Sequence, residues 1–119
     1  MNKQLIVAGA FALSACTGLG ESAPVSGVSV YQYVGSKQCE GGGAPVEKMA
    51  SQLSGAGIRV LSVTCGTDGR MYPAMCGAPD GRIGILEVPE GKVTAAAALG
   101  FARLSSLPGA SKTVCPTAP

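Results

Sequence analysis

The chain has 119 residues and a formal net charge of +2, with 18 glycines, 8 prolines and neither tryptophan nor histidine. The positive charge is weak and scattered, and no cluster of lysine and arginine is interleaved with aromatic residues, so we expect no nucleic-acid partner. Because histidine is absent, the common general base and triad partner is missing, and the sequence predicts a protein that is not an enzyme.

The first 15 residues have the order of a secretory signal peptide. Lys3 supplies a positive charge, an apolar run extends from Leu5 to Leu13, and small residues follow. The run is much shorter than the roughly 20 residues that span a bilayer as a helix. The sequence therefore predicts that residues 1–15 direct export and are then removed.

The residues Leu13-Ser14-Ala15-Cys16 resemble the lipobox of bacterial lipoproteins at every position of that motif. The resemblance implies that the chain is cleaved before Cys16, that the Cys16 thiol is diacylated, and that the new amino group can also be acylated. Two or three acyl chains anchor a protein stably in a membrane. Thr17 stands where an Asp would resemble the inner-membrane retention signal of enteric bacteria, so the resemblance implies an anchor in the outer membrane. The alternative is an ordinary signal peptide whose cleavage site precedes a cysteine.

The remaining chain divides into three segments. Residues 16–27 contain the acylated Cys16 and a small, polar stretch broken by proline and glycine, which predicts a flexible tether. Residues 28–115 form the predicted globular domain, and residues 116–119 a loose tail.

The first half of the domain predicts a strand, a helix and a second strand. Residues 28–34 are rich in valine and tyrosine and predict the first strand. A triple glycine at 41–43 marks a loop, and Pro45 suits the first turn of a helix. Apolar residues then recur at helical spacing, namely Val46, Met49, Ala50 and Leu53, until Gly55 and Gly57 end the helix. Residues 58–64 are rich in β-branched side chains and predict the second strand.

The second half predicts a third strand at 82–88, which Pro89 ends, and a second helix from about Glu90 to Gly100. A short final strand follows near 101–104, although the spacing of apolar residues also allows the helix to continue to Leu104. The order β-α-β-β-α-β, with both helices on one sheet face, predicts a single small two-layer α+β sandwich of ferredoxin-like order. That fold by itself carries almost no functional information.

Four cysteines remain besides Cys16, and an even number in an exported chain predicts two disulfides: Cys39, Cys65, Cys76 and Cys115. Three connectivities are open, of which we favour Cys65–Cys76 with Cys39–Cys115. A metal site is the competing interpretation, but the chain has no histidine and no C-x-x-C pair. We therefore expect no metal ion.

The segment Cys65-Gly66-Thr67-Asp68-Gly69-Arg70-Met71-Tyr72-Pro73-Ala74-Met75-Cys76 resembles the core of Kazal-type protease inhibitors, where Cys-Gly-x-Asp-Gly-x-Thr-Tyr-x-Asn-x-Cys recurs. The resemblance implies protease inhibition. It departs from the family at Met71 and Ala74, where the family has Thr and Asn. The family's reactive loop lies before Cys65, where residues 58–64 predict a buried strand. The alternative is a structural connection in which Asp68-Gly69 and Asp80-Gly81 make turns.

These observations predict a non-enzymatic, membrane-anchored lipoprotein of the bacterial envelope, which is a binding or structural accessory with no cofactor besides the lipid on Cys16. An envelope protein is the expected partner. The expected contact surface is an exposed edge strand or the Cys65–Cys76 loop, with Arg70, Met71, Tyr72 and Arg82. The alternative is an envelope protease inhibitor that uses the same loop.

Overall fold

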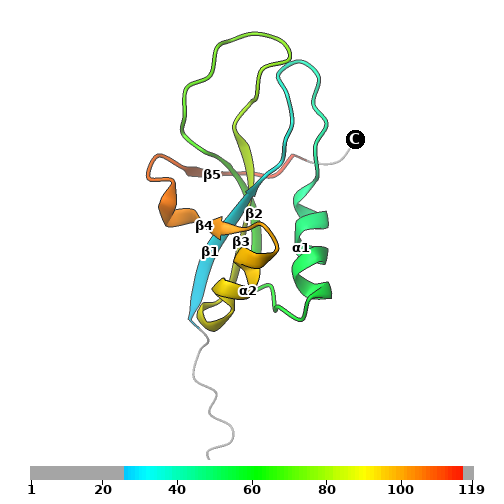
Figure 1. The fold of residues 1–119 in the computed structure, drawn as a ribbon. Coiled ribbons are helices and arrows are strands. Elements are labelled where there is room, and N and C mark those ends of the chain that lie inside the picture. The colour runs from blue at the N-terminus through cyan, green and yellow to red at the C-terminus, as the bar shows by residue number, and fades with distance from the viewer. Residues whose placement is uncertain (1–25, 117–119) are drawn as a thin grey trace, which may run out of the picture.

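An antiparallel sheet of five strands organises residues 26–116, the part of the chain that the computed structural model describes (Figure 1). Across the sheet the strand order is β4-β1-β3-β2-β5, and every neighbouring pair is antiparallel. With two helices and two disulfides, the chain forms a small α+β domain. The predicted leader, Cys16, most of the tether and residues 117–119 lie outside the described residues. The strands are β1 (Gly27–Tyr33), β2 (Ser62–Thr67), β3 (Arg82–Pro89), β4 (Ala102–Arg103) and β5 (Ser111–Thr113).

The central strand β3 is buried on both faces. Leu86 and Val88 belong to the main core cluster, while Ile83 and Ile85 belong to a second cluster. All four side chains are at most 2% exposed. This double burial explains why residues 83–88 are a nearly continuous apolar run rather than an alternating one.

Helix α1 (Val46–Gly55) packs on the face of the sheet that carries the main core. It buries Val46, Met49 and Leu53, so the helix predicted from the apolar spacing is confirmed. Gly84 of β3 makes this close packing feasible, because a Cβ at that position would collide with Met49 and Val46. Burying each such side chain contributes roughly 1.5–3 kcal/mol before chain entropy is subtracted.

The second helix, α2 (Val93–Ala98), follows a 3-10 turn (Glu90–Lys92) and contributes Ala96 to the same core cluster. After it, Gly100 adopts a φ of 98°, a left-handed conformation that suits glycine at the end of a helix. Phe101 then turns back into the main core and is 3% exposed. The alternative in which the helix continues to Leu104 is therefore wrong.

The opposite face of the sheet is partly covered by the segment that connects β4 to β5. These two strands form opposite edges of the sheet, so the connection must cross it. The connection contains a 3-10 turn (Leu104–Ser106) and Leu107, which packs in the second cluster. The predicted final strand is the two-residue β4. The sequence did not predict β5, whose three residues, Ser-Lys-Thr, are polar and exposed.

Strand β2 begins at Ser62, later than the predicted start at 58. Ile58 is 2% exposed and belongs to the main core, and its backbone N–H donates to the Leu53 carbonyl at 2.9 Å beyond the end of α1. The β-branched Ile58 is therefore buried, but it lies before the first residue of β2.

The two disulfides join Cys39 to Cys76 and Cys65 to Cys115, so the favoured pairing of Cys65 with Cys76 and Cys39 with Cys115 is wrong. The physical reason is the unpredicted strand β5. Cys65 lies in β2 opposite Thr113 of β5, and this register brings Cys115 next to Cys65. Cys76 lies in the following loop, where it meets the loop after β1.

Candidate functional site

Two loops project together from one end of the sheet (Figure 1). Residues 34–44 follow β1, and residues 68–81 connect β2 to β3; together we call them the loop lobe. The disulfide Cys39–Cys76 joins the two loops. Strand β1 begins at the opposite end of the sheet, so the lobe lies about 20 Å from the point where the chain enters the domain, at roughly 3.3 Å per strand residue.

Gln38 fastens the two loops to each other through both its backbone and its side chain. Its backbone N–H donates to the Ala78 carbonyl at 2.9 Å, and its carbonyl accepts from the Gly77 N–H at 2.9 Å. Its side-chain Nε2 donates to the Pro73 carbonyl at 2.8 Å, and its Oε1 accepts from the Met75 N–H at 3.1 Å. The arrangement of the two loops is therefore held by hydrogen bonds as well as by the disulfide.

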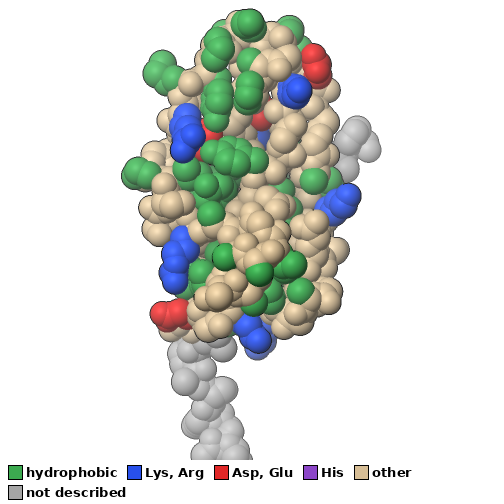
Figure 2. Space-filling view, viewed as in Figure 1, with side chains coloured by type: hydrophobic (Ala, Val, Ile, Leu, Met, Phe, Trp, Pro, Cys, Tyr) green, Lys and Arg blue, Asp and Glu red, His purple; other side chains and the backbone are tan. Residues whose placement is uncertain are grey.

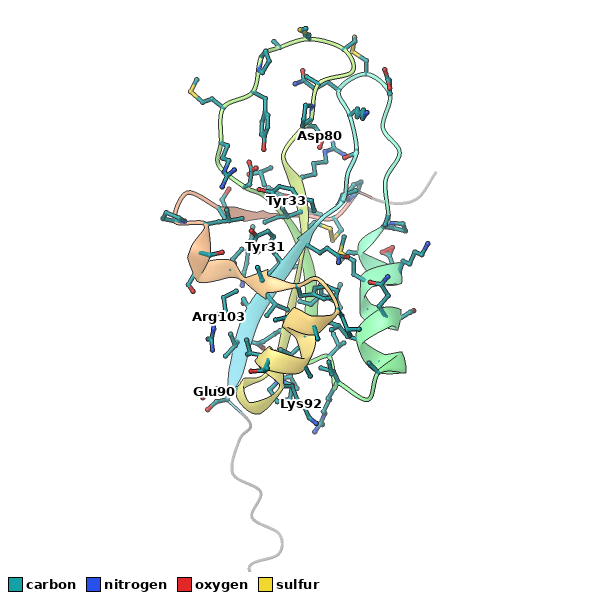
Figure 3. The ribbon with its side chains drawn as sticks, in the orientation of Figure 1. Tyr31, Tyr33, Asp80, Glu90, Lys92 and Arg103 are labelled. Carbon is teal, nitrogen blue, oxygen red and sulfur yellow. A yellow bond between two sulfur atoms is a disulfide. The ribbon has the colours of Figure 1, made fainter. Side chains whose placement is uncertain are left out.

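Asp68 is a buried acceptor at the base of the loop lobe and is 3% exposed. Its Oδ2 accepts from the Tyr33 hydroxyl at 3.0 Å and from the Tyr72 hydroxyl, and its Oδ1 accepts from the Arg70 N–H at 2.9 Å. Tyr31 packs edge-on against the Tyr33 ring, with the ring centroids 5.6 Å apart. Figure 3 shows Tyr33 where the lobe meets the sheet. The Asp68 carboxylate thus connects Tyr33 of β1 to Arg70 and Tyr72 of the second loop.

These contacts set the protonation states of the cluster. Burial by itself raises the pKa of the Asp68 carboxyl, but hydrogen bonds from Tyr72, the Arg70 N–H and Tyr33 outweigh burial and hold that pKa below its usual value. Burial, followed by the hydrogen bond to Asp68, raises the pKa of Tyr33 to about 12. The hydrogen bond to Asp68 also raises the pKa of Tyr72. At neutral pH the cluster is therefore an ionised carboxylate that accepts hydrogen bonds from two neutral phenols.

A second carboxylate, Asp80, ties the first loop to the start of β3. The hydroxyl of Ser36, which is 5% exposed, donates to Asp80 Oδ2 at 2.6 Å. The backbone N–H of Arg82 donates to Asp80 Oδ1 at 3.0 Å, and its guanidinium Nε lies 3.6 Å from Oδ2. Figure 3 shows Asp80 inside the lobe. Both predicted Asp-Gly turns are thus held by a hydrogen bond from outside the second loop. Tyr33 of β1 donates to Asp68, and Ser36 of the first loop donates to Asp80.

The loop lobe exposes two methionine side chains to solvent. Met71 is 95% exposed and Met75 is 57% exposed. Figure 2 shows hydrophobic side chains gathered over the lobe, with basic and acidic side chains around them. Exposed apolar side chains that gather in one patch are typical of contact surfaces.

The four residues proposed for partner binding have different surroundings. Arg70 and Met71 are exposed and free to contact a partner. Tyr72 is half-buried because its hydroxyl bonds to Asp68, and Arg82 lies at the first position of β3 beside Asp80. The sequence interpretation missed Gln38 as an organiser of the site, since no local pattern marks a residue whose bonds all reach a distant loop.

A groove of about 440 Å³ lies beside the lobe, between the start of α1 and the Cys65–Cys115 disulfide. Its walls are mostly apolar, and Arg82 and Glu47 contribute charged groups to its lining. Within residues 26–116, no group of three or more His, Cys, Asp or Glu side chains is placed to hold a metal ion. In the same range, none of the helices combines the length and the apolar character needed to cross a membrane.

Comparisons of the chain with protein-family models, with curated proteins and with solved structures find no match.

Proposed function

We propose that this protein is a lipoprotein anchored in the outer membrane of the bacterial envelope, and that its small disulfide-bonded domain binds an envelope partner without catalysing a reaction. The anchor is the covalent lipid on Cys16. The contact surface is the loop lobe, centred on Arg70 and Met71.

The motif Leu13-Ser14-Ala15-Cys16 is the observation that carries the proposed anchor. It follows a charged residue and an apolar run of signal-peptide length, which is the order that lipoprotein processing requires. The two disulfides of the described domain are consistent with an oxidising compartment outside the cytoplasm.

Metabolic labelling with palmitate tests the anchor. We expect label on the wild-type protein and none on Cys16→Ser, whereas the matched variant Thr17→Ser keeps it. Thr17→Asp in an enteric host tests the proposed destination, because we expect this change to move the protein from the outer-membrane fraction to the inner-membrane fraction. Unchanged label on Cys16→Ser would end the lipoprotein proposal.

Three features of the loop lobe support its role as the contact surface. It lies at the end of the sheet opposite the start of β1, so an anchor joined through β1 attaches at the end of the domain that is remote from the lobe. Its shape is held by the Cys39–Cys76 disulfide and by the hydrogen bonds of Gln38, so binding costs little ordering of the backbone. Met71, at 95% exposed, supplies apolar area and an adaptable side chain.

Site-specific photo-crosslinking in intact cells tests the contact surface. A photoreactive amino acid at position 71 is compared with the same amino acid at position 48, an exposed position on α1 outside the lobe. We expect a discrete protein adduct from position 71 that Arg70→Glu weakens, and none from position 48. Equal adducts from both positions, or none from position 71, would contradict the proposed surface.

For the fold, the finer proposal is a two-layer sandwich of ferredoxin-like order. Two observations support it. Four neighbouring strands have the order β4-β1-β3-β2, and both helices contribute to one core cluster. Strand β5 and the segment that crosses the second face are additions to that arrangement.

Protease inhibition through the Cys65–Cys76 loop is the second candidate function. The specific observation in its favour is that Met71 is almost fully exposed while the residues on each side of it are bonded to Asp68. Titration against chymotrypsin-like and subtilisin-like proteases tests it, with Met71→Asp as the control. Tight inhibition that this variant loses supports the inhibitor, and cleavage after Met71 without inhibition refutes it.

A further inference from the structure

The two disulfides lie in different surroundings. Cys65 and Cys115 are half-buried and pack against the main core cluster. Cys39 and Cys76 are both exposed, and neither belongs to a core cluster. Thiol–disulfide exchange requires an incoming thiolate to reach a sulfur atom, so access favours attack on the disulfide of the loop lobe.

The backbone at Cys39 is also unusual. Its φ is 70°, and among the described residues it is the one non-glycine residue with a positive φ. A side chain in this region is strained, and such a residue persists where surrounding bonds hold it. Opening the disulfide removes the covalent bond at Cys39, while the backbone N–H groups of Glu40 and Gly41 still donate to the Lys37 carbonyl at 3.1 and 2.8 Å.

The rest of the loop lobe does not depend on the disulfide alone. Gln38, next to Cys39 in the chain, bonds to Pro73, Met75, Gly77 and Ala78 of the other loop. These bonds keep the two sulfur atoms in neighbouring positions when the covalent bond is open. Reduction at this site is therefore a local and reversible change.

We propose that Cys39–Cys76 is a site of thiol–disulfide exchange with a dithiol reductant. A thiolate of the dithiol attacks one sulfur of the pair, which breaks the Cys39–Cys76 bond, forms a mixed disulfide and releases the other cysteine as a thiolate. The second thiol of the reductant then attacks the reductant's own sulfur in the mixed disulfide. This step forms an intramolecular disulfide in the reductant and releases the second protein cysteine as a thiolate. Two electrons and two protons pass from the dithiol to Cys39 and Cys76, while Cys65–Cys115 stays oxidised.

Graded reduction of the full-length protein tests this proposal. Free thiols are first blocked with N-ethylmaleimide, so that Cys16 cannot interfere. The protein is then equilibrated with increasing dithiothreitol, new thiols are labelled with iodoacetamide, and peptides are mapped by mass spectrometry beside far-UV circular dichroism. We expect Cys39 and Cys76 to be labelled together at a dithiothreitol concentration at least about tenfold below that for Cys65 and Cys115, with the spectrum unchanged.

Two results would overturn the proposal. One is labelling of Cys65 and Cys115 at an equal or lower dithiothreitol concentration. The other is labelling of all four cysteines in a single step that coincides with loss of the spectrum. A variant gives an independent measurement, because Cys39→Ala/Cys76→Ala must keep the wild-type far-UV spectrum if reduction is local. If Cys39→Ala/Cys76→Ala is unfolded, the exchange proposal is contradicted. This outcome does not bear on the lipid anchor, which palmitate labelling tests separately.

Discussion

Replacing Asp68 by asparagine tests whether the buried carboxylate holds the base of the loop lobe together. Asp68 is 3% exposed and accepts three hydrogen bonds, from Tyr33, Tyr72 and the Arg70 N–H. Asparagine has nearly the same shape but lacks the charge, and its NH₂ group cannot accept a bond from a phenol. Asp68→Asn therefore removes the charge-assisted bonds while keeping the volume.

The size of the effect follows from these bonds. A hydrogen bond to a charged group contributes about 1.5–3 kcal/mol, but water replaces much of this contribution where the donor is accessible. Tyr33 is 40% exposed, so its bond counts for less than the full value. We expect Asp68→Asn to lower the free energy of unfolding by about 2–4 kcal/mol at neutral pH.

The pH dependence has a definite sign. The pKa of the Asp68 carboxyl is lower in the folded protein than its ordinary value, so the unfolded chain binds the proton more tightly. The stabilisation by Asp68 is therefore fully present above the unfolded-state pKa of about 3.9. It is lost as the pH falls through the lower, folded-state pKa. The stability difference between wild type and Asp68→Asn shrinks accordingly in acid.

Urea unfolding monitored by circular dichroism, at neutral pH and in acid, measures both quantities. A double-mutant cycle with Tyr33→Phe isolates one contact, and we expect the two changes to be less than additive because they remove the same bond. A loss below about 0.5 kcal/mol at neutral pH is the size typical of surface substitutions and would refute the proposed role of Asp68. A loss that does not change with pH would refute the reasoning about its ionisation.

Leu53→Ala should lower the free energy of unfolding by about 2–5 kcal/mol, because Leu53 is fully buried on the face of α1 that packs on the sheet. The exposed Gln52→Ala, on the same helix, should stay within about 0.5 kcal/mol, and urea unfolding of both variants decides this. Gly84→Ala should destabilise the domain, because the added Cβ collides with Met49. Gly91→Ala is the control, because its Cβ meets nothing within 4 Å, and thermal unfolding compares the two variants. Gln38→Ala should speed amide hydrogen exchange at Met75, whose N–H donates to the Gln38 side-chain Oε1, and leave β3 unchanged, because Gln38 bonds only within the loop lobe; equal acceleration in both segments would contradict that role.

The helices show what local patterns can predict. Val46, Met49 and Leu53 recur at helical spacing, and the structure buries all three on the sheet. Gly100 ends the second helix region because a left-handed residue is needed there, and glycine adopts that conformation at little cost. Both inferences depend on residues a few positions apart, and the structure confirms both.

The candidate site shows where local patterns stop. The Asp68-Gly69 pair indicates a turn, but nothing near Asp68 in the chain shows that Tyr33 of β1 donates to it. The favoured disulfide pairing failed for the same reason. Cys65 and Cys76 are close in sequence, but β2 pairs with a strand near the C-terminal end of the described residues, and Cys115 comes with that strand.

The amino-acid sequence by itself determined the helix at 46–55, the central apolar strand and the turns, because periodicity, glycine conformation and Asp-Gly pairs act over a few neighbouring residues. The lipobox-like motif at Cys16 is likewise a property of the sequence alone. Only the tertiary structure decided the fifth strand, the disulfide pairing and the burial of Asp68. Each of these depends on which distant segments become neighbours in the sheet, and that is set by the packing of the whole domain.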